Sequence, residues 1–282
     1  MSRPSVLNDN IEQHYTRSGL AASILAALKR AGKNVERLTL ADLAPVDEFH
    51  VRGGEATLEL ARAAGLRADM HVLDVGSGIG GPSRRIAREF GCRVTGIDLT
   101  DEYCRTATVL AERVGLSDLV TYRQGDALDL PFPGATFDLI WTQHASMNIP
   151  DKSTLYREMF RVLKPGGRVA IYDILAGPAG PVHFPVPWAH GPETSFLLGP
   201  DELRQVLEAA GFEIVIWRDS TEAAVAWFTA LSGKIQQGGL PPVGIHLLLG
   251  DDFPAMARNQ VRNLKEGRIV LAQVVAQKAI VT

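Results

Sequence analysis

The feature that most constrains this chain is a glycine-rich turn between a short apolar run and a helical stretch. The sequence reads Val-Leu-Asp-Val over 72–75 and Gly-Ser-Gly-Ile-Gly-Gly-Pro over 76–82. The apolar run predicts a buried strand, and a proline just after the turn is typical of the first turn of a helix. Glycines let a ligand approach the backbone closely, and the helix start offers it free N–H groups. The turn therefore predicts a ligand site at a strand end.

Apolar runs and helical stretches alternate from this turn onward. We predict strands at Val72–Val75, Arg93–Ile97, Leu119–Tyr122, Phe137–Trp141, Arg168–Ile174, Phe212–Trp217 and Ile269–Lys278. The helices between them are expected at Pro82–Phe90, Asp101–Val114, Lys152–Leu163 and Pro200–Ala210. Strands that alternate with helices of this length form βαβ units around a parallel sheet. The predicted fold class is therefore α/β.

The first 65 residues precede this alternation and are expected to be helical. The spacing of their apolar residues predicts helices within 8–31, 33–45 and 55–64. Gly19 is a predicted break in the first of them. The second is expected to end before Pro45, because proline interrupts a helix interior.

Two later stretches also fall outside the alternation. Residues 177–199 are rich in proline and aromatic residues, and residues 221–267 are too long for one crossover helix. We predict an N-terminal helical cap segment over 1–65, followed by a domain over 66–282 that carries the two stretches as cap insertions. This mainly helical cap is expected to cover the crevice at the carboxyl ends of the strands, where a reaction needs shielding from water.

Composition narrows the class of protein. The 282 residues are 46% hydrophobic and carry a formal net charge of −3, which does not provide the basic face that nucleic acids need. No apolar run approaches the roughly 20 residues of a membrane span, and two cysteines make no disulfide framework. The seven histidines show no metal-ligand spacing. We therefore expect a cytoplasmic protein with no nucleic acid, membrane or metal partner.

Carboxylates near the turn discriminate between a nicotinamide dinucleotide and S-adenosylmethionine as the ligand. The run Gly76–Gly81 formally matches the dinucleotide fingerprint, and Asp98 after the second strand suits a ribose diol. Asp74 would repel a pyrophosphate but attract the ammonium group of S-adenosylmethionine. Asp126 after the third strand can accept a hydrogen bond from an adenine amine. The sequence also lacks the Tyr-x-x-x-Lys pair of short-chain dehydrogenases.

Together these residues resemble the class I S-adenosylmethionine-dependent methyltransferases. The resemblance covers roughly residues 66–175 and rests on Asp74–Gly81, Asp98, Gly125–Ala127 and the Leu163–Gly167 turn into the fifth strand. It implies a Rossmann-like, seven-stranded, mostly parallel sheet with helices on both faces and an antiparallel last strand. It also implies S-adenosyl-L-methionine as the cofactor. The cofactor-binding residues would be Asp74, Gly76, Ser77, Gly78, Asp98, Leu99, Asp126, Ala127 and Gln143.

The lead-in Asp47–Gly54 resembles that of small-molecule enzymes, namely sarcosine/dimethylglycine N-methyltransferases and ubiquinone-biosynthesis type C-methyltransferases. The expected function is transfer of a methyl group to an N, O or C atom of a small molecule by in-line displacement. An NAD-dependent oxidoreductase and a non-catalytic S-adenosylmethionine-binding protein are the alternatives. The sequence does not identify the acceptor, and both a monomer and a homodimer are compatible with it.

The reacting end is expected after the fourth strand, because residues beyond strand ends face the ligand crevice of an open α/β sheet. Gln143 and His144 are candidate catalytic residues there, and His50 joins them from the cap. A hydroxyl or acidic carbon as acceptor requires a base, which either histidine suits, whereas a neutral amine requires none. The predicted substrate contacts are Tyr15, Asn148 and Trp188. The alternative for His144 is a structural hydrogen bond, and for Tyr15 and Trp188 it is core packing.

Overall fold

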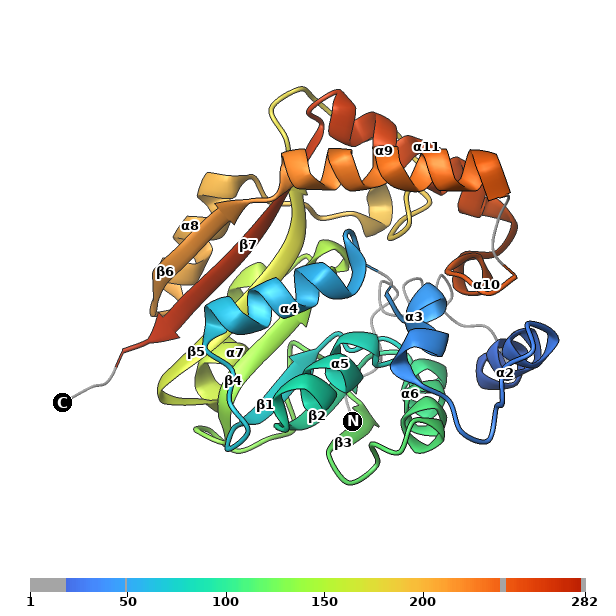
Figure 1. The fold of residues 1–282 in the computed structure, drawn as a ribbon. Coiled ribbons are helices and arrows are strands. Elements are labelled where there is room, and N and C mark those ends of the chain that lie inside the picture. The colour runs from blue at the N-terminus through green and yellow to red at the C-terminus, as the bar shows by residue number, and fades with distance from the viewer. Residues whose placement is uncertain (1–18, 49, 239–241, 280–282) are drawn as a thin grey trace.

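The computed structural model describes residues 19–48, 50–238 and 242–279. At its centre lies one twisted sheet with helices on both faces (Figure 1). The strand order is β3-β2-β1-β4-β5-β7-β6. The strands are β1 His71–Val75, β2 Arg93–Asp98, β3 Val120–Gln124, β4 Phe137–Gln143, β5 Leu163–Ala176, β6 Phe212–Asp219 and β7 Ile269–Lys278.

Strands β1 to β5 pair in parallel, and β7 runs antiparallel to both of its neighbours, β5 and β6. On β1, Val72 pairs with Val94 of β2 on one side and with Leu139 of β4 on the other. The mostly parallel, seven-stranded sheet with an antiparallel last strand is therefore confirmed. Parallel strands bring their carboxyl ends to one edge, which is where the residues of interest gather.

Alternate residues of the central strands serve two separate cores. On β1, Val72 packs in the core beneath α4 (Gly53–Ala64), α5 (Gly81–Phe90) and α6 (Asp101–Arg113). Leu73 faces the other core, beneath α7 (Lys152–Val162) and α8 (Pro200–Ala209). Because both faces are covered, the strands are apolar almost throughout, as the sequence pattern indicated.

Strand β5 begins five residues earlier than predicted. Leu163 pairs with Phe137 of β4, and the next pair joins Arg168 to Leu139. Residues 164–167 thus form an excursion within β5, opposite a single residue of β4. The expected turn into the fifth strand is present as this excursion, and Gly166 adopts a φ of 75° within it.

The prediction that a helix ends before Pro45 is wrong. Helix α3 spans Leu40–Asp47 and continues through the proline. It begins late because Thr39 and Asp42 form a capping box, in which each side chain accepts a hydrogen bond from the other residue's backbone N–H. Leu43 and Val46 are fully buried, so tertiary packing stabilises the last turn despite the proline. Helix α2, Leu20–Arg30, starts directly after Gly19, as expected.

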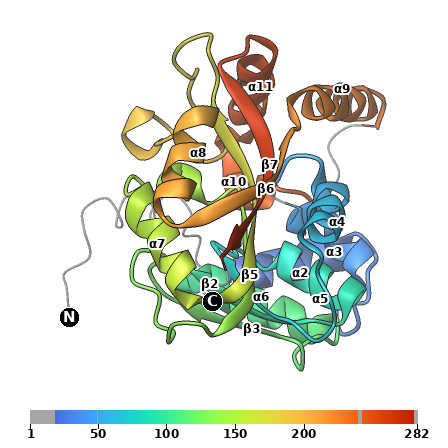
Figure 2. The ribbon, with the colours of Figure 1, turned by 90° about the vertical axis from the view of Figure 1, so that its left-hand side faces the viewer.

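Helix α4 covers a face of the sheet, and the other described segments outside the strand–helix alternation gather at its carboxyl edge (Figures 1 and 2). Residues 221–267 contain α9 (Thr221–Gly238), α10 (His246–Leu249) and α11 (Phe253–Lys265), and α9 contacts α11. Residues 177–199 are mostly irregular, with one short 3-10 turn at Pro192–Thr194. Among the helices that the structure describes, none has the length and apolar character needed to cross a bilayer.

Candidate functional site

The glycine turn is held in place by the neighbouring strand. The N–H groups of Gly76 and Ser77 both donate to the carbonyl of Ile97, at 2.8 and 3.1 Å. Gly76 has a φ of 76°, and a Cβ placed on it would lie 2.3 Å from the Cβ of Ala145. Gly78 also has a positive φ, of 53°, but a Cβ there would meet nothing within 4 Å. The first glycine is thus required by packing, whereas the second borders open space.

Asp98, at the end of β2, anchors the same turn. One carboxylate oxygen accepts from the N–H of Gly78 at 2.8 Å, and the other accepts from the N–H of Thr100 at 2.9 Å. Burial raises the pKa of Asp98, although these backbone hydrogen bonds oppose the shift. A carboxylate oxygen has more than one acceptor direction. Asp98 therefore orders the turn while it keeps acceptor capacity for a ligand.

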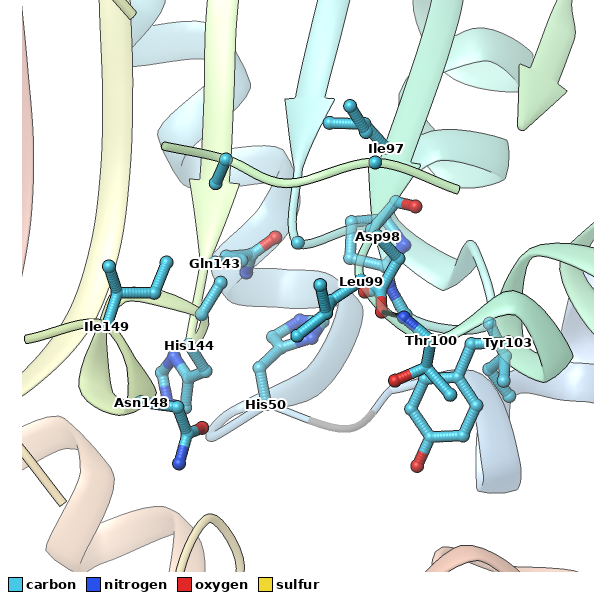
Figure 3. Close-up of a pocket in the computed structure, with 18 of the residues that line it drawn as sticks. His50, Ile97, Asp98, Leu99, Thr100, Tyr103, Gln143, His144, Asn148 and Ile149 are labelled. Atoms are coloured by element: carbon cyan, nitrogen blue, oxygen red, sulfur yellow. Dashed lines mark hydrogen bonds between the residues drawn. The ribbon is translucent and has the colours of Figure 1, made fainter. Parts of the chain in front are cut away.

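Two cavities meet at the carboxyl edge. The turn cavity, of about 250 Å³, is lined by the glycine turn, by the ends of β2 and β4, and by residues after β3. The cap cavity, of about 340 Å³, is lined mainly by the cap segments. His50 and His144 line both cavities and so form their common wall. Figure 3 shows both rings at the turn cavity, together with Asp98, Gln143 and Asn148.

Gln143 presents an unpartnered donor at the turn cavity. Its Oε1 accepts from Trp141 Nε1 at 3.1 Å and from Thr57 Oγ1 at 3.3 Å. These two donors fix the amide orientation, so its Nε2 is directed elsewhere. That Nε2 is buried and has no hydrogen-bond partner among the described residues, and the same holds for Ser77 Oγ. Both residues line the turn cavity, which therefore offers two donors to a ligand with acceptor groups.

The two histidines use their ring nitrogens differently. His144 Nδ1 lies 3.0 Å from the carbonyl oxygen of Tyr172, and its Nε2 accepts from the N–H of Val51 at 3.4 Å. His50 Nε2 lies 2.9 Å from the carbonyl oxygen of Gly53 and 2.9 Å from Thr57 Oγ1. A carbonyl only accepts, so the proton of His50 is on Nε2. Nδ1 of His50 then carries a lone pair, whereas both nitrogens of His144 are engaged.

Both rings are neutral at pH 7. Burial lowers the pKa of His50 to about 4 and that of His144 to about 3, and for His144 the nearby His50 adds to the shift. The ring centroids lie 6.2 Å apart. The common wall of the cavities is therefore uncharged in the structure as it stands.

Two ion pairs join the cap to α5, the helix that follows the glycine turn. Asp47 accepts from Arg84 at 2.6 Å, and both side chains are buried. Next to it, Glu48 pairs with Arg85 through its Oε1. Burial raises the pKa of Asp47 to about 6, and Arg84 opposes that shift. Because Asp47 also lines the turn cavity, this joint fixes the distance between the cap and the turn.

Comparisons with known proteins agree with this geometry. Residues 73–171 match the family model described as a methyltransferase domain. The sterol 24-C-methyltransferase of Eremothecium gossypii is 34% identical over 183 residues, which cover 62% of this chain and 49% of that protein. The chain thus spans about half the length of the curated relatives it matches.

Solved structures extend the likeness to nearly the whole chain. The [4+2]-cyclase SpnF is 25% identical, with a TM-score of 0.66, and the match covers 93% of this chain and 96% of SpnF. Geranyl diphosphate C-methyltransferase from Streptomyces coelicolor A3(2), in complex with Mg²⁺, geranyl diphosphate and S-adenosyl-L-homocysteine, is 17% identical with a TM-score of 0.72. That match covers 99% of this chain and 100% of the other.

Residues 73–171 form a methyltransferase domain. The resemblance expected from the glycine turn and its carboxylates is thereby confirmed, as is the Rossmann-like fold. The family model and these curated relatives are methyltransferases, and they do not favour the oxidoreductase alternative. The match of residues 73–171 centres on the turn and the strand ends, which is the part with specific sequence motifs.

Most residues predicted for the cofactor site of the methyltransferase domain line the turn cavity. They are Gly76, Ser77, Gly78, Asp98, Leu99, Asp126, Ala127 and Gln143. Asp74 is the exception, because it does not line the cavity. Its carboxylate accepts from Ser83 Oγ at 2.5 Å within the protein, and burial raises its pKa to about 7. The structure therefore corrects Asp74 from a ligand contact to a support beneath the turn.

The predicted substrate contacts fall in different places. Asn148 lines the turn cavity, and its Nδ2 donates to the carbonyls of Trp188 and Thr194. Trp188 lines the cap cavity, and its Nε1 donates to Ser195 Oγ at 2.9 Å. Tyr15 lies outside the described residues. Asn148 and Trp188 are thus linked to each other but border different cavities.

Sequence reasoning missed several residues at the two cavities of the methyltransferase domain. Thr57 links His50 to Gln143, and the aromatic wall of the cap cavity includes Trp227, Phe228 and Phe253. The segment that holds Asp47 and Glu48 was recognised as a lead-in, but their arginine partners were not. Most of these contacts join residues that are far apart in the chain, so no local signal identifies them.

Proposed function

We propose that this chain is an S-adenosylmethionine-dependent methyltransferase that acts on a small molecule. One observation carries the proposal, namely that the turn cavity and the cap cavity meet at the shared wall of His50 and His144. A methyl donor and an acceptor in adjoining cavities are aligned for direct transfer. Such alignment is worth on the order of 7–11 kcal/mol of an activation barrier.

The turn cavity fits the cofactor by its chemistry. S-adenosylmethionine supplies a methyl group that is already activated by its sulfonium centre. Ser77 Oγ and Gln143 Nε2 are buried donors without protein partners, and they suit the polar methionine end. Asp98 accepts from the ribose hydroxyls, and the segment around Asp126 and Ala127 borders the adenine. Gly78 keeps the backbone open to the ligand.

The cap segments act as the lid of the site in this proposal. Residues from all three line the cap cavity, among them Glu48, Trp188 and Trp227. Their task is to exclude water from the reacting centre. Limited proteolysis with and without S-adenosylhomocysteine tests this role. Slower cleavage within the first 54 residues in the presence of the ligand supports a lid, and equal rates contradict it.

The decisive experiment combines binding with turnover. S-adenosylmethionine and NAD are titrated against the full chain by calorimetry, and only the former is expected to bind. Methyl-labelled S-adenosylmethionine is then incubated with an unsaturated sterol, geranyl diphosphate or sarcosine. We expect a labelled product and an equal amount of S-adenosylhomocysteine. Binding of NAD instead, or no binding of S-adenosylmethionine, would overturn the proposal.

The likeness to SpnF favours a second candidate function, in which the protein binds S-adenosylmethionine without transferring its methyl group. SpnF has this fold and is described as a [4+2]-cyclase. The same experiment separates the two functions. Conversion of an added polyene without formation of S-adenosylhomocysteine supports a cyclase. Formation of labelled methylated product and S-adenosylhomocysteine in equal amounts supports the methyltransferase.

A further inference from the structure

The cap cavity is predominantly apolar. Two thirds of the described residues that line it are hydrophobic, with aromatic rings from separate cap segments at Trp188, Trp227, Phe228 and Phe253. Among the described residues that line it there is no lysine, and the one arginine among them, Arg258, is exposed at the surface. A phosphate or diphosphate group needs several cationic or N–H donors. This lining therefore favours an acceptor without an anionic head group.

One acidic side chain in this lining is incompletely paired. Glu48 Oε1 is held by Arg85, but Oε2 is buried and has no hydrogen-bond partner among the described residues. This oxygen lies 3.4 Å from His50 Nε2. A buried carboxylate oxygen without a donor is unfavourable unless a positive charge arrives beside it. His50 is the group next to Glu48 that can become positively charged.

His50 is also the histidine with an available lone pair. Its Nε2 is committed to Gly53 and Thr57, and its Nδ1 has no partner among the described residues. The ring lines both cavities, whereas both nitrogens of His144 are occupied by Tyr172 and Val51. A proton received by His50 Nδ1 would make the ring an imidazolium ion directly beside Glu48.

Resting on the function proposed above, we propose that the cap cavity binds an uncharged, largely apolar acceptor, and that His50, backed by Glu48, receives the proton that this acceptor loses. The balance of the reaction requires such a group. The bond from the methyl carbon to sulfur breaks and its electron pair stays on sulfur, while a new bond forms between the methyl carbon and the acceptor. The acceptor then carries one positive charge until a proton leaves it, and that proton passes to His50 Nδ1.

Glu48 is a positioning residue in this arrangement. It stabilises the imidazolium form of His50 from 3.4 Å and does not itself touch the reacting atoms. Arg85 holds Glu48 in place and opposes the rise in its pKa that burial causes. The aromatic rings of the cavity add attraction for the transient cation on the acceptor.

The first test is the tautomer of His50. The full chain is labelled with ¹⁵N-histidine, and the His50 signals are assigned from their absence in His50→Gln. We expect the ¹⁵N shifts at pH 7 to show a neutral ring with its proton on Nε2 and an unprotonated Nδ1. A neutral ring with its proton on Nδ1 would overturn the role of His50 as proton acceptor.

The second test probes the charge preference of the cap cavity with three ligands of one skeleton. Geranylamine is cationic at pH 7, geraniol is neutral and geranic acid is anionic. Their dissociation constants are measured by calorimetry on the full chain. We expect geraniol and geranylamine to bind at least tenfold more tightly than geranic acid. Equal affinity for the acid and the amine, or no binding of any of the three, would overturn the proposal.

A variant of Glu48 tests whether its charge contributes to the binding of geranylamine in the cap cavity. Glu48→Gln keeps the shape but removes the charge, so we expect geranylamine to bind at least fivefold more weakly and geraniol to change less than twofold. The control is Glu55→Gln, because Glu55 is 70% exposed on the same segment, and it should leave all three affinities unchanged. An unchanged affinity of Glu48→Gln for geranylamine would contradict the role of Glu48. Titration of S-adenosylmethionine on the same samples reports the proposed function separately.

Discussion

The turn cavity and the cap cavity share two histidines but are built in opposite ways. The turn cavity is made by consecutive strand ends, so its residues follow a regular order along the chain, from Gly76 through Asp98 and Asp126 to Gln143. The cap cavity is made mainly by three segments, around Glu48, Trp188 and Trp227, and the first lies more than a hundred residues before the other two. The difference teaches that an α/β sheet provides the cofactor site, while added segments determine what else can bind.

The joint between the two regions is expected to give the largest effect. Asp47→Asn removes the charged partner of buried Arg84, so we expect the free energy of unfolding to fall by about 3–5 kcal/mol. Urea denaturation measures it. The control Asp69→Asn breaks an exposed pair with Arg67 and should change the same quantity by less than about 1 kcal/mol. Similar small effects in both variants would mean that the joint does not hold the cap.

Asp98→Ala should weaken ligand binding in the turn cavity and leave ligand binding in the cap cavity unchanged. We expect the affinity for S-adenosylmethionine to fall by about 1.5–3 kcal/mol, the usual worth of a hydrogen bond to a charged group. The stability without ligand should fall as well, because Asp98 also holds Gly78 and Thr100. Binding of geraniol in the cap cavity should stay within twofold. The control is Asp101→Ala, because the Asp101 side chain is 42% exposed and does not line the turn cavity, and an equal loss of cofactor affinity there would remove Asp98 from the site.

Gly78→Val tests the open space at the turn. Gly78 and Gly115 both have positive φ, and a Cβ on either meets no atom within 4 Å, but only Gly78 lines the turn cavity. Both valine variants should lose about 1–2 kcal/mol of stability from backbone strain. Only Gly78→Val should lose cofactor affinity, by at least tenfold or about 1.4 kcal/mol. Equal affinities of the two variants in calorimetry would contradict this reading of the turn.

Phe228→Ala tests whether the cap cavity binds its ligand independently of the turn cavity. Removing a ring from its lining should weaken geraniol binding by about 1 kcal/mol, through lost apolar contact area. Titration of S-adenosylmethionine should give the wild-type affinity within twofold. Thr229→Ala, at an exposed position on the same helix, is the control. A parallel loss of cofactor affinity in Phe228→Ala would mean that the two cavities act as one.

The pH dependence of Asp74 tests the support beneath the turn. Burial raises its pKa in the folded protein from 3.8 to about 7, so the folded state retains a proton that the unfolded state releases. Its contribution to stability is thus fully present below about pH 4 and is lost as the pH rises through about 7. Relative to Asp74→Asn, the wild type should be less stable at pH 8 than at pH 5. A difference in unfolding free energy that does not change with pH would contradict the shift.

The sequence predicted the strands of the sheet more accurately than the segments and contacts around them. Strand positions were predicted within a few residues because burial on both faces leaves continuous apolar runs, as in β1 and β7. The end of α3 was misjudged because the burial of Leu43 and Val46 outweighs the effect of Pro45. Asp74 was assigned to the ligand because its position in the sequence does not reveal that Ser83 occupies its carboxylate.

What the sequence determined by itself is the sheet, the glycine turn and the row of residues at the strand ends. Those features depend on local periodicity, on the backbone freedom of glycine and on the rule that parallel strands end at one edge. Only the tertiary structure decided that His50 keeps a lone pair while His144 does not, and that Gln143 turns a free donor to the turn cavity. These properties depend in part on contacts between residues distant in the chain, such as His144 with Tyr172 and Gln143 with Thr57. A hydrogen bond depends on where its partner lies in space, which no short pattern in the sequence records.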